Sequence, residues 1–415
     1  MTAALPNETL FAVFEHLQPD VLTLVIRASS RFQAIAERIL YSNISILELL
    51  PVSSPVPART QRCCQSLLAH PHLALLVRSL NVRWQTDPGL HDQYLPFVDP
   101  VLDLLNQALR TLVQLEDLDL ALGLIGTPIG VQDVLNGCRF PGLRFFAICG
   151  LGRGSLPAKY YPAESTVEPF LAMTPSIVHM RLVDHYGPLH LAPHHLPVLS
   201  AFRGTPFAAA SLIPGRPVRC LSLVGQEHIT DMELSRIAQG SVKMCWLDIS
   251  AVPLTPNVLR DVSHHLTSIE TLKFKLALRH TLHHSFTGIS ILAGLTPVIG
   301  AFPALYQLDL SASPVSNSGS GSSLEETALC TTWGRSCPSL RSVVFPSKTE
   351  WRLTPERIWP PAADAVAEPD FSPQGAWLGR GTWRAEGTGR RHALRAGRRT
   401  AEHALAAARA WQRAS

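Results

Sequence analysis

A short apolar pattern, L-x-x-L-x-L, recurs along most of the chain and restricts its fold more than any other feature. It is clearest at Leu115, Leu118 and Leu120, and most copies follow an approach marked by Leu or Pro. The copies predict ten strands, centred near residues 81, 119, 147, 181, 202, 222, 248, 273, 309 and 344. The centres are 20 to 38 residues apart, with stretches of helical spacing between them. Units of this kind bury their apolar faces only against one another, as in a solenoid.

The predicted fold class is therefore α/β, with a leucine-rich-repeat-like solenoid over residues 76–358. We expect each unit to add one strand to a parallel sheet and one helix or loop to the outer face. An ordinary α/β sheet protein also alternates strands and helices. Its buried parallel strands would read as long runs of Val and Ile, and the repeats contain no such runs. The number of repeats and their exact boundaries stay open.

Ahead of the repeats, residues 1–46 predict three short helices. The first spans about residues 6–17 and carries apolar residues at helical spacing, namely Leu10, Val13, Phe14 and Leu17. We expect Asp20 to cap the second helix and Ser29–Ser30 to open the third. A domain of about 40 residues is marginal by itself, so it needs a surface to pack against. Residues 47–75 are expected to form a linker with packing helices.

The end of the chain differs from the rest in composition. The formal charge of the chain is +4, but residues 376–415 hold nine Arg against two acids, so this segment is +7 and residues 1–375 carry −3. The repeats stop near residue 359, and Ala, Gly, Arg and Pro then predominate, which predicts disorder over 359–415. The abrupt change also raises the hypothesis of a shifted reading frame, which a transcript sequence would test. An Arg-rich segment with interleaved Trp can bind nucleic acid, but we interpret this one as a solvated tail and expect no nucleic-acid partner.

The cysteines and one apolar run give information on the cellular compartment of the protein. Its eight Cys include no C-x-x-C pair and follow no secretory signal, so we expect reduced thiols in an intracellular protein. Residues 289–308 form an uncharged run of membrane-spanning length. Pro297 and Pro303 interrupt it, which favours a buried helix, turn and strand over a membrane span. We therefore expect a cytoplasmic or nuclear protein with no membrane partner.

No motif in the sequence assembles a catalytic, metal or cofactor site. Gly150, Gly152 and Gly154 follow a predicted strand, but their spacing and the prolines after them do not fit a dinucleotide-binding turn. Two His clusters, at 190–195 and 280–284, lack the acidic or Cys partner of a metal site. Nucleophile-elbow, P-loop and zinc-protease motifs do not occur. We expect no enzyme activity, no metal and no cofactor.

The N-terminal segment "LPNETLFAVFEHLQPDVL" (5–22) resembles an F-box. The family pattern has an opening Leu-Pro, an acid two residues later, an Ile or Val followed by Phe, a Leu, and then two more short helices. The residues at the matching positions are Leu5, Pro6, Glu8, Val13, Phe14 and Leu17. The match covers about residues 4–45 and departs from the family at Ala28 and Phe32, which both stay apolar.

An F-box followed by irregular leucine-rich repeats is similar to the substrate receptors of SCF-type cullin–RING ubiquitin ligases. The closing pattern around Trp333 and Trp351 looks like that of the large class of fungal F-box proteins. The resemblance implies that the F-box binds the adaptor subunit, and through it a cullin, while the repeats bind a protein target and the chemistry happens on other subunits. The residues implied in adaptor binding, or in its support, are Leu5, Pro6, Glu8, Leu10, Val13, Phe14 and Leu17.

Two other functions stay open beside this one. The chain could be an interaction scaffold that binds the adaptor without directing ubiquitination, or an enzyme with an unrecognised site in a repeat loop. Each candidate adaptor-binding residue could also serve only the packing of the three helices. The sequence does not identify the target or say whether it must be phosphorylated, and the concave face lined by strand residues is the place to look for its binding site.

Overall fold

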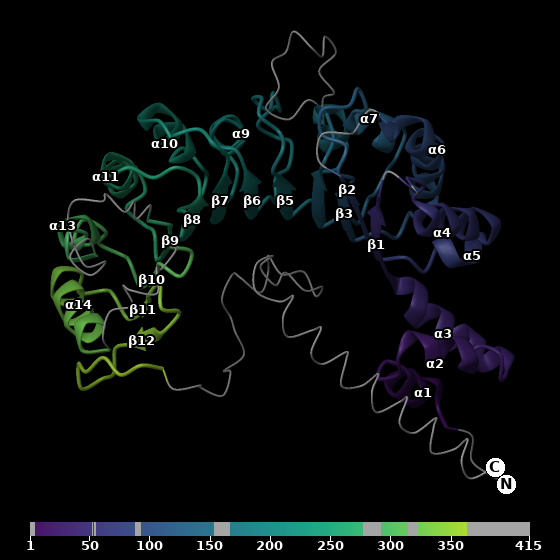
Figure 1. Cartoon of the computed structure of the whole chain (residues 1–415), viewed down its shortest axis with the longest axis horizontal. Helices are drawn as coiled ribbons and strands as arrows, with labels where there is room; N and C mark the ends of the chain where they lie inside the picture. Colours follow the sequence, from purple (N-terminus) through teal and green to yellow (C-terminus); the bar gives the residue numbers. More distant parts are fainter. Residues whose placement is uncertain are drawn as a thin grey trace. The chain divides into compact units, whose positions relative to one another are not determined.

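The computed structural model describes residues 5–51, 53, 55–87, 93–152, 167–276, 292–313 and 323–362 (Figure 1). The chain divides into two units, Met1–Val366 and Ala367–Ser415, and every described residue belongs to the first. The predicted tail over 359–415 therefore lies outside the described residues, except for residues 359–362.

In the described part of the chain, twelve strands form one sheet whose order in space is their order in the sequence. The strands are β1 (Asn43–Leu50), β2 (Ser79–Thr86), β3 (Asp117–Ala121), β4 (Phe145–Cys149), β5 (His179–Leu182), β6 (Ala201–Gly204), β7 (Cys220–Val224), β8 (Trp246–Ala251), β9 (Thr271–Lys273), β10 (Gln307–Asp309), β11 (Ser342–Val344) and β12 (Glu350–Arg352). Successive strands pair in parallel, and only β12 runs antiparallel to its neighbour. The predicted α/β class with a parallel repeat sheet is confirmed.

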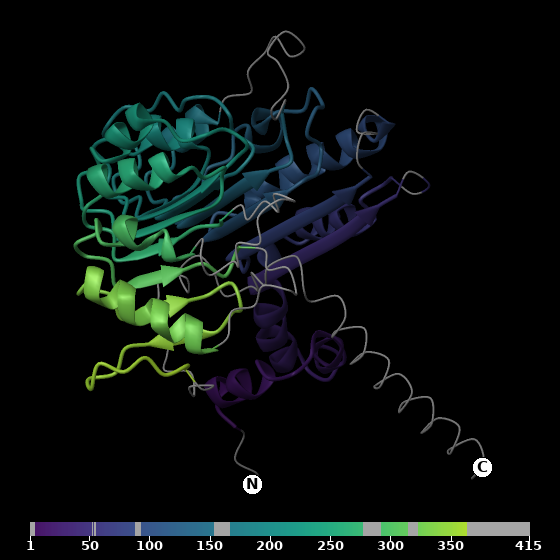
Figure 2. The same ribbon diagram turned by 60° about the vertical axis from the view of Figure 1, so that its left-hand side comes forward.

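The helices that connect the strands lie along one side of the sheet, the outer side in Figures 1 and 2. The described helices are α1 (Asn7–Phe14), α2 (Pro19–Val25), α3 (Ser30–Ser42), α4 (Ala58–Ala69), α5 (Pro71–Ala74), α6 (Leu95–Thr111), α7 (Val131–Leu135), α8 (Glu168–Ala172), α9 (Pro206–Leu212), α10 (Asp231–Ile237), α11 (Pro256–His265), α13 (Thr296–Ile299) and α14 (Ser323–Ser336). Neighbouring helices pack in chain order, as α4 does with α6, α9 with α10, and α13 with α14. Each repeat therefore rests on the next one, as a solenoid requires.

All ten predicted strand centres lie inside observed strands, from β2 to β11. The L-x-L pattern misses β1 and β12, so the sheet begins at Asn43 rather than at residue 76. On β1 an acid, Glu48, takes an inward position that the pattern reserves for an apolar residue. β12 has three residues, of which only Trp351 is buried, which is too short for a recognisable repeat.

Glu48 is tolerated inside because it caps a helix. Its carboxylate accepts hydrogen bonds from the backbone N–H groups of Arg59, at 2.6 Å, and Thr60, at 3.0 Å, in the first turn of α4. It also accepts from Thr60 Oγ1 at 2.6 Å, and that hydroxyl in turn accepts from Trp84 Nε1 at 2.9 Å. A carboxylate at a helix N-terminus is stabilised by the free N–H groups and by the helix dipole. The acid therefore ties β1 to α4 and β2.

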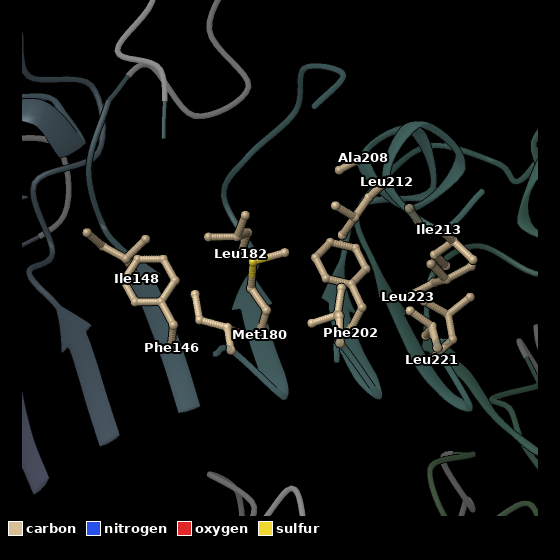
Figure 3. Close-up of a cluster of buried hydrophobic side chains, with 14 of the residues drawn as sticks. Phe146, Ile148, Met180, Leu182, Phe202, Ala208, Leu212, Ile213, Leu221 and Leu223 are labelled. Atoms are coloured by element: carbon tan, nitrogen blue, oxygen red, sulfur yellow. The ribbon is translucent and has the colours of Figure 1, made fainter. Parts of the chain in front are cut away.

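Inward-facing strand residues form a continuous apolar core between the sheet and the helices (Figure 3). Phe146, Met180 and Phe202 are fully buried register partners on β4, β5 and β6. Figure 3 shows them on the same side of the sheet as Ala208 and Leu212 of α9. Because residues two apart on a strand share a face, the L-x-L pattern sends both of its leucines into this core.

A buried arginine fastens the one long connection, residues 183–200 between β5 and β6, that has no helix among its described residues. Arg216 is 2% exposed. Its Nε donates to the carbonyl of His195 at 2.9 Å and its Nη2 to that of Ala192 at 2.8 Å. Its Nη1 donates to the carbonyl of Leu212 on α9. Burial lowers the pKa of Arg216, and the carbonyl acceptors compensate for the lost hydration.

The apolar run at 289–308 is confirmed as helix, turn and strand over its described residues, 292–308. The run contains α13 and the first two residues of β10, and both elements contribute to the core of the sheet, through Ile299 and Leu308. Among the described residues, no helix combines the length and the apolarity that crossing a bilayer requires.

Candidate functional site

The helices α1, α2 and α3 form a small core of their own, separate from the core of the sheet. We call residues 5–42 the three-helix unit. Its buried apolar members are Leu10, Phe14, Leu22, Ile35 and Ala36. The rings of Phe14 and Phe32 meet edge to face, with centroids 5.4 Å apart, which is a favoured aromatic arrangement. The prediction of three short helices is confirmed, and α3 continues into β1 without a break.

The two predicted helix caps have different outcomes. Ser29 caps α3, because its side chain accepts a hydrogen bond from the N–H of Phe32 at 3.2 Å. The prediction that Asp20 caps α2 is wrong, since the cap position is Gln18 and Asp20 lies in the first turn. The reason is Pro19, whose fixed φ suits the first helical position, so that the cap lies two residues earlier than predicted, at Gln18. Asp20 still favours the helix through its charge near the N-terminus.

The structure divides the seven candidate adaptor-binding residues by exposure. Those that contribute to the small core, or pack at its edge, are Leu10, Phe14 and Leu17. Those exposed to solvent are Leu5, Pro6, Glu8 and Val13. Leu5 is 55% exposed and Val13 is 50% exposed. The apolar stripe of α1 therefore splits, with one part serving the core and another facing outward.

The exposed segment before α1 is held in place by an arginine of α3. Arg31 Nε donates to Asn7 Oδ1 at 2.7 Å, and Arg31 Nη2 donates to the carbonyl of Leu5. These bonds fix the backbone of the segment and leave the Leu5 side chain outside. Sequence reasoning did not identify Arg31, because its partner residues lie 24 and 26 positions earlier in the chain.

Two further apolar residues, Val21 and Leu24 on α2, are exposed, and neither belongs to the seven candidates. Leu24 is 66% exposed, while Leu22 of the same short helix is buried in the small core. Residues two apart on a helix do not share a face, so this signal was present in the spacing. Together with Leu5 and Val13, these side chains give the three-helix unit more exposed apolar surface than its core explains.

The strands present a second candidate surface on the side of the sheet away from the helices, which we call the open face. One row of register partners crosses this face from β1 to β12, and its members are Ser45, Asn81, Asp119, Ala147, Arg181, Arg203, Ser222, Asp248, Lys273, Asp309, Val344 and Glu350. Most members are polar or charged, whereas the residues that alternate with them are mostly apolar and, from β2 onward, buried. Faces of this kind are the extended binding surfaces of solenoid proteins.

A Leu-Asp-x-Ser sequence recurs on the open face and stabilises the ends of two strands. Asp248 Oδ1 accepts from the N–H of Ser250 at 2.9 Å and from its Oγ at 2.6 Å. Asp309 Oδ1 accepts from the N–H of Ser311 at 2.8 Å in the same way. An aspartate that bonds the backbone two residues on is an Asx turn, which directs the chain out of the strand.

Asp119 occupies the same row but has no serine two residues later. The position is Ala121, and Asp119 Oδ1 is buried without a hydrogen-bond partner among the described residues. Its other oxygen, Oδ2, pairs with Arg83 Nη2 at 3.0 Å across β2 and β3. At the other end of the face, Lys273 Nζ pairs with Asp309 Oδ2 at 3.0 Å. The cations near both ends of the row therefore have carboxylate partners.

The glycine pattern after β4 packs two loops together. Gly150 has φ +80°, and a Cβ atom there would lie 2.2 Å from the backbone nitrogen of Gly123. Its N–H donates to Asp184 Oδ2 at 2.8 Å. Burial raises the pKa of Asp184, and this hydrogen bond acts in the opposite direction. Gly150 is thus required by close backbone approach, and Gly154 lies outside the described residues.

The histidines and cysteines form no group of three or more metal-ligand side chains in the described residues. His194 and His195 meet edge to face, with ring centroids 4.3 Å apart, and the cluster at 280–284 lies outside the described residues. All eight cysteines are free thiols. Burial raises the pKa of Cys64 to about 12, which keeps that thiol protonated. The hydrogen bond with Cys220 on β7 lowers the pKa of Cys245, the residue just before β8.

Comparisons with known proteins do not identify a family for this chain. The chain matches no protein-family model and no curated protein. A crystal structure of an internalin from Listeria monocytogenes has a TM-score of 0.28 and 12% sequence identity, covering 71% of this chain and 91% of that one. At that score the likeness establishes neither fold nor function. The repeat architecture rests on the order and register of the strands themselves.

Proposed function

We propose that the chain is the substrate-recognition subunit of an SCF-type cullin–RING ubiquitin ligase. In this proposal the three-helix unit binds the adaptor subunit, and through it a cullin, while the open face binds a protein target in the cytoplasm or nucleus. The observation that carries the proposal is the exposure of Leu5 and Val13 on a unit whose core is already formed by other side chains. Both residues lie at positions of the F-box pattern.

The energetics of these side chains support a docking role. Covering a half-exposed Leu or Val side chain contributes on the order of 1 kcal/mol to association. Exposed apolar side chains are enriched at protein interfaces, and this small unit has four of them, Leu5, Val13, Val21 and Leu24. Arg31 already orders the backbone at Leu5, so less conformational entropy is lost when a partner binds there.

The proposed mechanism needs no chemistry from this chain. The open face would hold a target so that its lysines lie near a ubiquitin-charged enzyme carried by other subunits. Holding two reactants together makes their reaction effectively unimolecular, which is a large acceleration without a catalytic residue. We accordingly propose no active site, metal or cofactor for the chain.

Affinity capture with the full chain tests the adaptor half of the proposal. Leu5→Glu and Val13→Glu place a charge in the proposed interface, so we expect adaptor and cullin recovery to fall about tenfold or more. The matched control is Leu324→Glu on α14, where the side chain is 82% exposed and far along the sequence, and recovery should stay at the wild-type level. Full recovery by the Leu5→Glu, Val13→Glu double variant would overturn the residue assignment.

Phe14 is a poorer choice for this test than the exposed residues. Pro6→Ala combined with Phe14→Ala should also abolish adaptor capture, but Phe14 lies in the small core, so the loss would come from unfolding. Circular dichroism and amide exchange of the variants separate the two causes.

A reconstituted ligase tests the second half. Proteins that accumulate in cells when residues 1–46 are deleted are the candidate targets, and one that the full chain binds is then incubated with the assembled complex. Transfer of ubiquitin to that protein supports the receptor function. Binding of both partners without transfer supports the alternative, a scaffold that acts without ubiquitination.

A further inference from the structure

Two arginines are neighbours in the row that crosses the open face. Arg181 on β5 and Arg203 on β6 are register partners, so their backbones are about 4.8 Å apart. The next members of the row on either side are small, Ala147 on β4 and Ser222 on β7. Like charges on adjacent strands are unfavourable. The pair therefore gains from any anion that approaches both guanidinium groups.

Arg83 and Lys273 each pair with a carboxylate, whereas Arg203 forms no ion pair among the described residues. Its Nε is buried without a hydrogen-bond partner among the described residues. Burial, and next the charge of Arg181, lower the pKa of Arg203, while Asp248 acts in the opposite direction. Asp248 is itself engaged, because it accepts from Ser222 Oγ at 3.3 Å and from Ser250. By contrast, Lys273 has a carboxylate oxygen at 3.0 Å.

Arg181 contacts a thiol and lies near a carboxylate that has a second donor. Its Nη2 donates to Cys149 Sγ at 3.8 Å, and a thiol sulfur is a weak acceptor. Its charge lowers the pKa of Asp184, but Asp184 Oδ2 also accepts from the N–H of Gly150. A ligand oxygen between the two arginines would meet donors with strong, directional geometry.

We propose that Arg181 and Arg203 bind a carboxylate side chain of an acidic segment in the protein target. The inference rests on the proposed function and names the chemistry that the open face recognises. A guanidinium fork matches the two oxygens of a carboxylate, and two neighbouring forks can share one carboxylate between them.

The acidic residues of the open face favour binding of a single carboxylate over binding of a polyanion. Asp119, Asp248, Asp309 and Glu350 belong to the same row, so a nucleic acid laid along it would meet repeated negative charge. Asp184 and Asp248 also offset part of the charge of the arginine pair. A carboxylate with one charge suits this local balance better than a phosphoryl group with nearly two.

A peptide library tests the site directly with the full chain. Peptides with randomised flanks and a central residue fixed as Glu, Gln or phosphoserine are immobilised and incubated with the protein. We expect retention on the Glu library, and a loss of about tenfold or more in Arg203→Gln. Arg203→Lys keeps the charge without the fork and should fall between the two. Equal retention on Glu and Gln, or retention on phosphoserine alone, would overturn the proposal.

Matched controls keep the test specific to this pair. Lys273→Gln removes a cation of the same row that Asp309 already neutralises, so retention on the Glu library should stay unchanged. An equal loss in Lys273→Gln would show a general charge effect and overturn the site. The thermal midpoint of each variant checks its folding, and Arg181→Gln provides a second variant if Arg203→Gln is destabilised.

Adaptor capture separates this proposal from the one on which it rests. Arg203→Gln should recover adaptor and cullin at the wild-type level, because the three-helix unit is unchanged. If the wild-type chain fails to capture the adaptor but still prefers the Glu library, the ligase function is wrong and the carboxylate site stands. If capture succeeds and the preference for Glu is missing, the carboxylate site is wrong and the ligase function stands.

Discussion

The three-helix unit and the repeat sheet bury their apolar residues in different ways. The unit relies on five buried apolar side chains, and it leaves Leu5, Val13 and Leu24 at least half exposed. The described residues of the repeats share one core, with members from Leu50 to Trp359, and each repeat packs on its neighbour. The same kind of amphipathic segment therefore serves two ends, a surface for a partner in one region and self-packing in the other.

This difference predicts that a core mutation unfolds the three-helix unit more readily than it unfolds a repeat of the sheet. A unit of about 40 residues has little stability to lose, so one deleted side chain can unfold it. A repeat in the middle of a solenoid is held from both sides, and its stability includes both interfaces. The predictions below test this contrast, beginning with the largest expected effect.

Phe14→Ala should unfold the three-helix unit and leave the sheet folded. Removing a buried Phe costs about 3–5 kcal/mol, which is comparable to the whole stability of a domain of this size. Hydrogen exchange measured by mass spectrometry should show lost protection over residues 7–42 and unchanged protection from β2 onward. Phe202→Ala, the matched deletion in the sheet, should cost a similar amount but leave the three helices protected. Retained protection over 7–42 in Phe14→Ala would contradict the contrast.

Arg216→Met should destabilise the sheet by about 3 kcal/mol, because it leaves buried carbonyls of the β5–β6 connection without a donor. The methionine keeps most of the volume, so the cost reports the hydrogen bonds. Urea denaturation of the two proteins measures it. The control is Arg219→Met at an exposed position three residues away, where we expect a change within about 0.5 kcal/mol. Equal midpoints for Arg216→Met and the wild type would show that the connection is held by other contacts.

Ala121→Ser should stabilise the sheet by about 1 kcal/mol. The new hydroxyl would reach Asp119 Oδ1, which is buried without a partner among the described residues, as Ser250 reaches Asp248. The reverse change, Ser250→Ala, should cost a similar amount. Thermal denaturation of both variants checks the pair. A loss of stability in Ala121→Ser would mean that the Leu-Asp-x-Ser turns are not equivalent between repeats.

The smallest expected effect is a pH dependence of the sheet through His179. Burial, and next the charge of Arg144, lower the pKa of His179 in the folded chain. The unfolded chain then binds more protons below the ordinary His pKa of about 6.5, so stability falls as the pH drops through that value. His179→Asn should lose less stability than the wild type between neutral pH and mild acid, as measured by urea midpoints. An identical pH slope in both proteins would exclude His179 as the source.

Much of the repeat sheet was predictable because its determinants are local. Two leucines at i and i+2 on a strand point the same way, so the ten copies of the pattern could be placed without knowing their neighbours. The pattern did not place β1 in the sheet, for the opposite reason. Glu48 lies inward only because the first turn of α4 supplies donors from Arg59 and Thr60, and that helix begins ten residues later in the chain.

For the three-helix unit, the sequence predicted which residues form the apolar stripe but not which of them are exposed. Helical spacing groups Leu10, Val13, Phe14 and Leu17 into one stripe, but it does not say how much of the stripe the neighbouring helices cover. In the structure α2 and α3 cover Leu10 and Phe14 and leave Val13 exposed. Arg31 anchors the segment at Leu5. It has no sequence signal, because its partners Asn7, in α1, and Leu5, just before α1, lie far from it in the chain.

The sequence by itself determined that the chain has a helical N-terminal unit and a repeat sheet. The period of the apolar residues sets whether a segment is a helix or a strand and which side it buries. Only the tertiary structure decided which polar residues become neighbours on the open face. Arg181 and Arg203 are 22 positions apart, and irregular repeat lengths hide their relation in the chain. Backbone hydrogen bonding sets the register of β5 against β6, and that register places the two charges side by side.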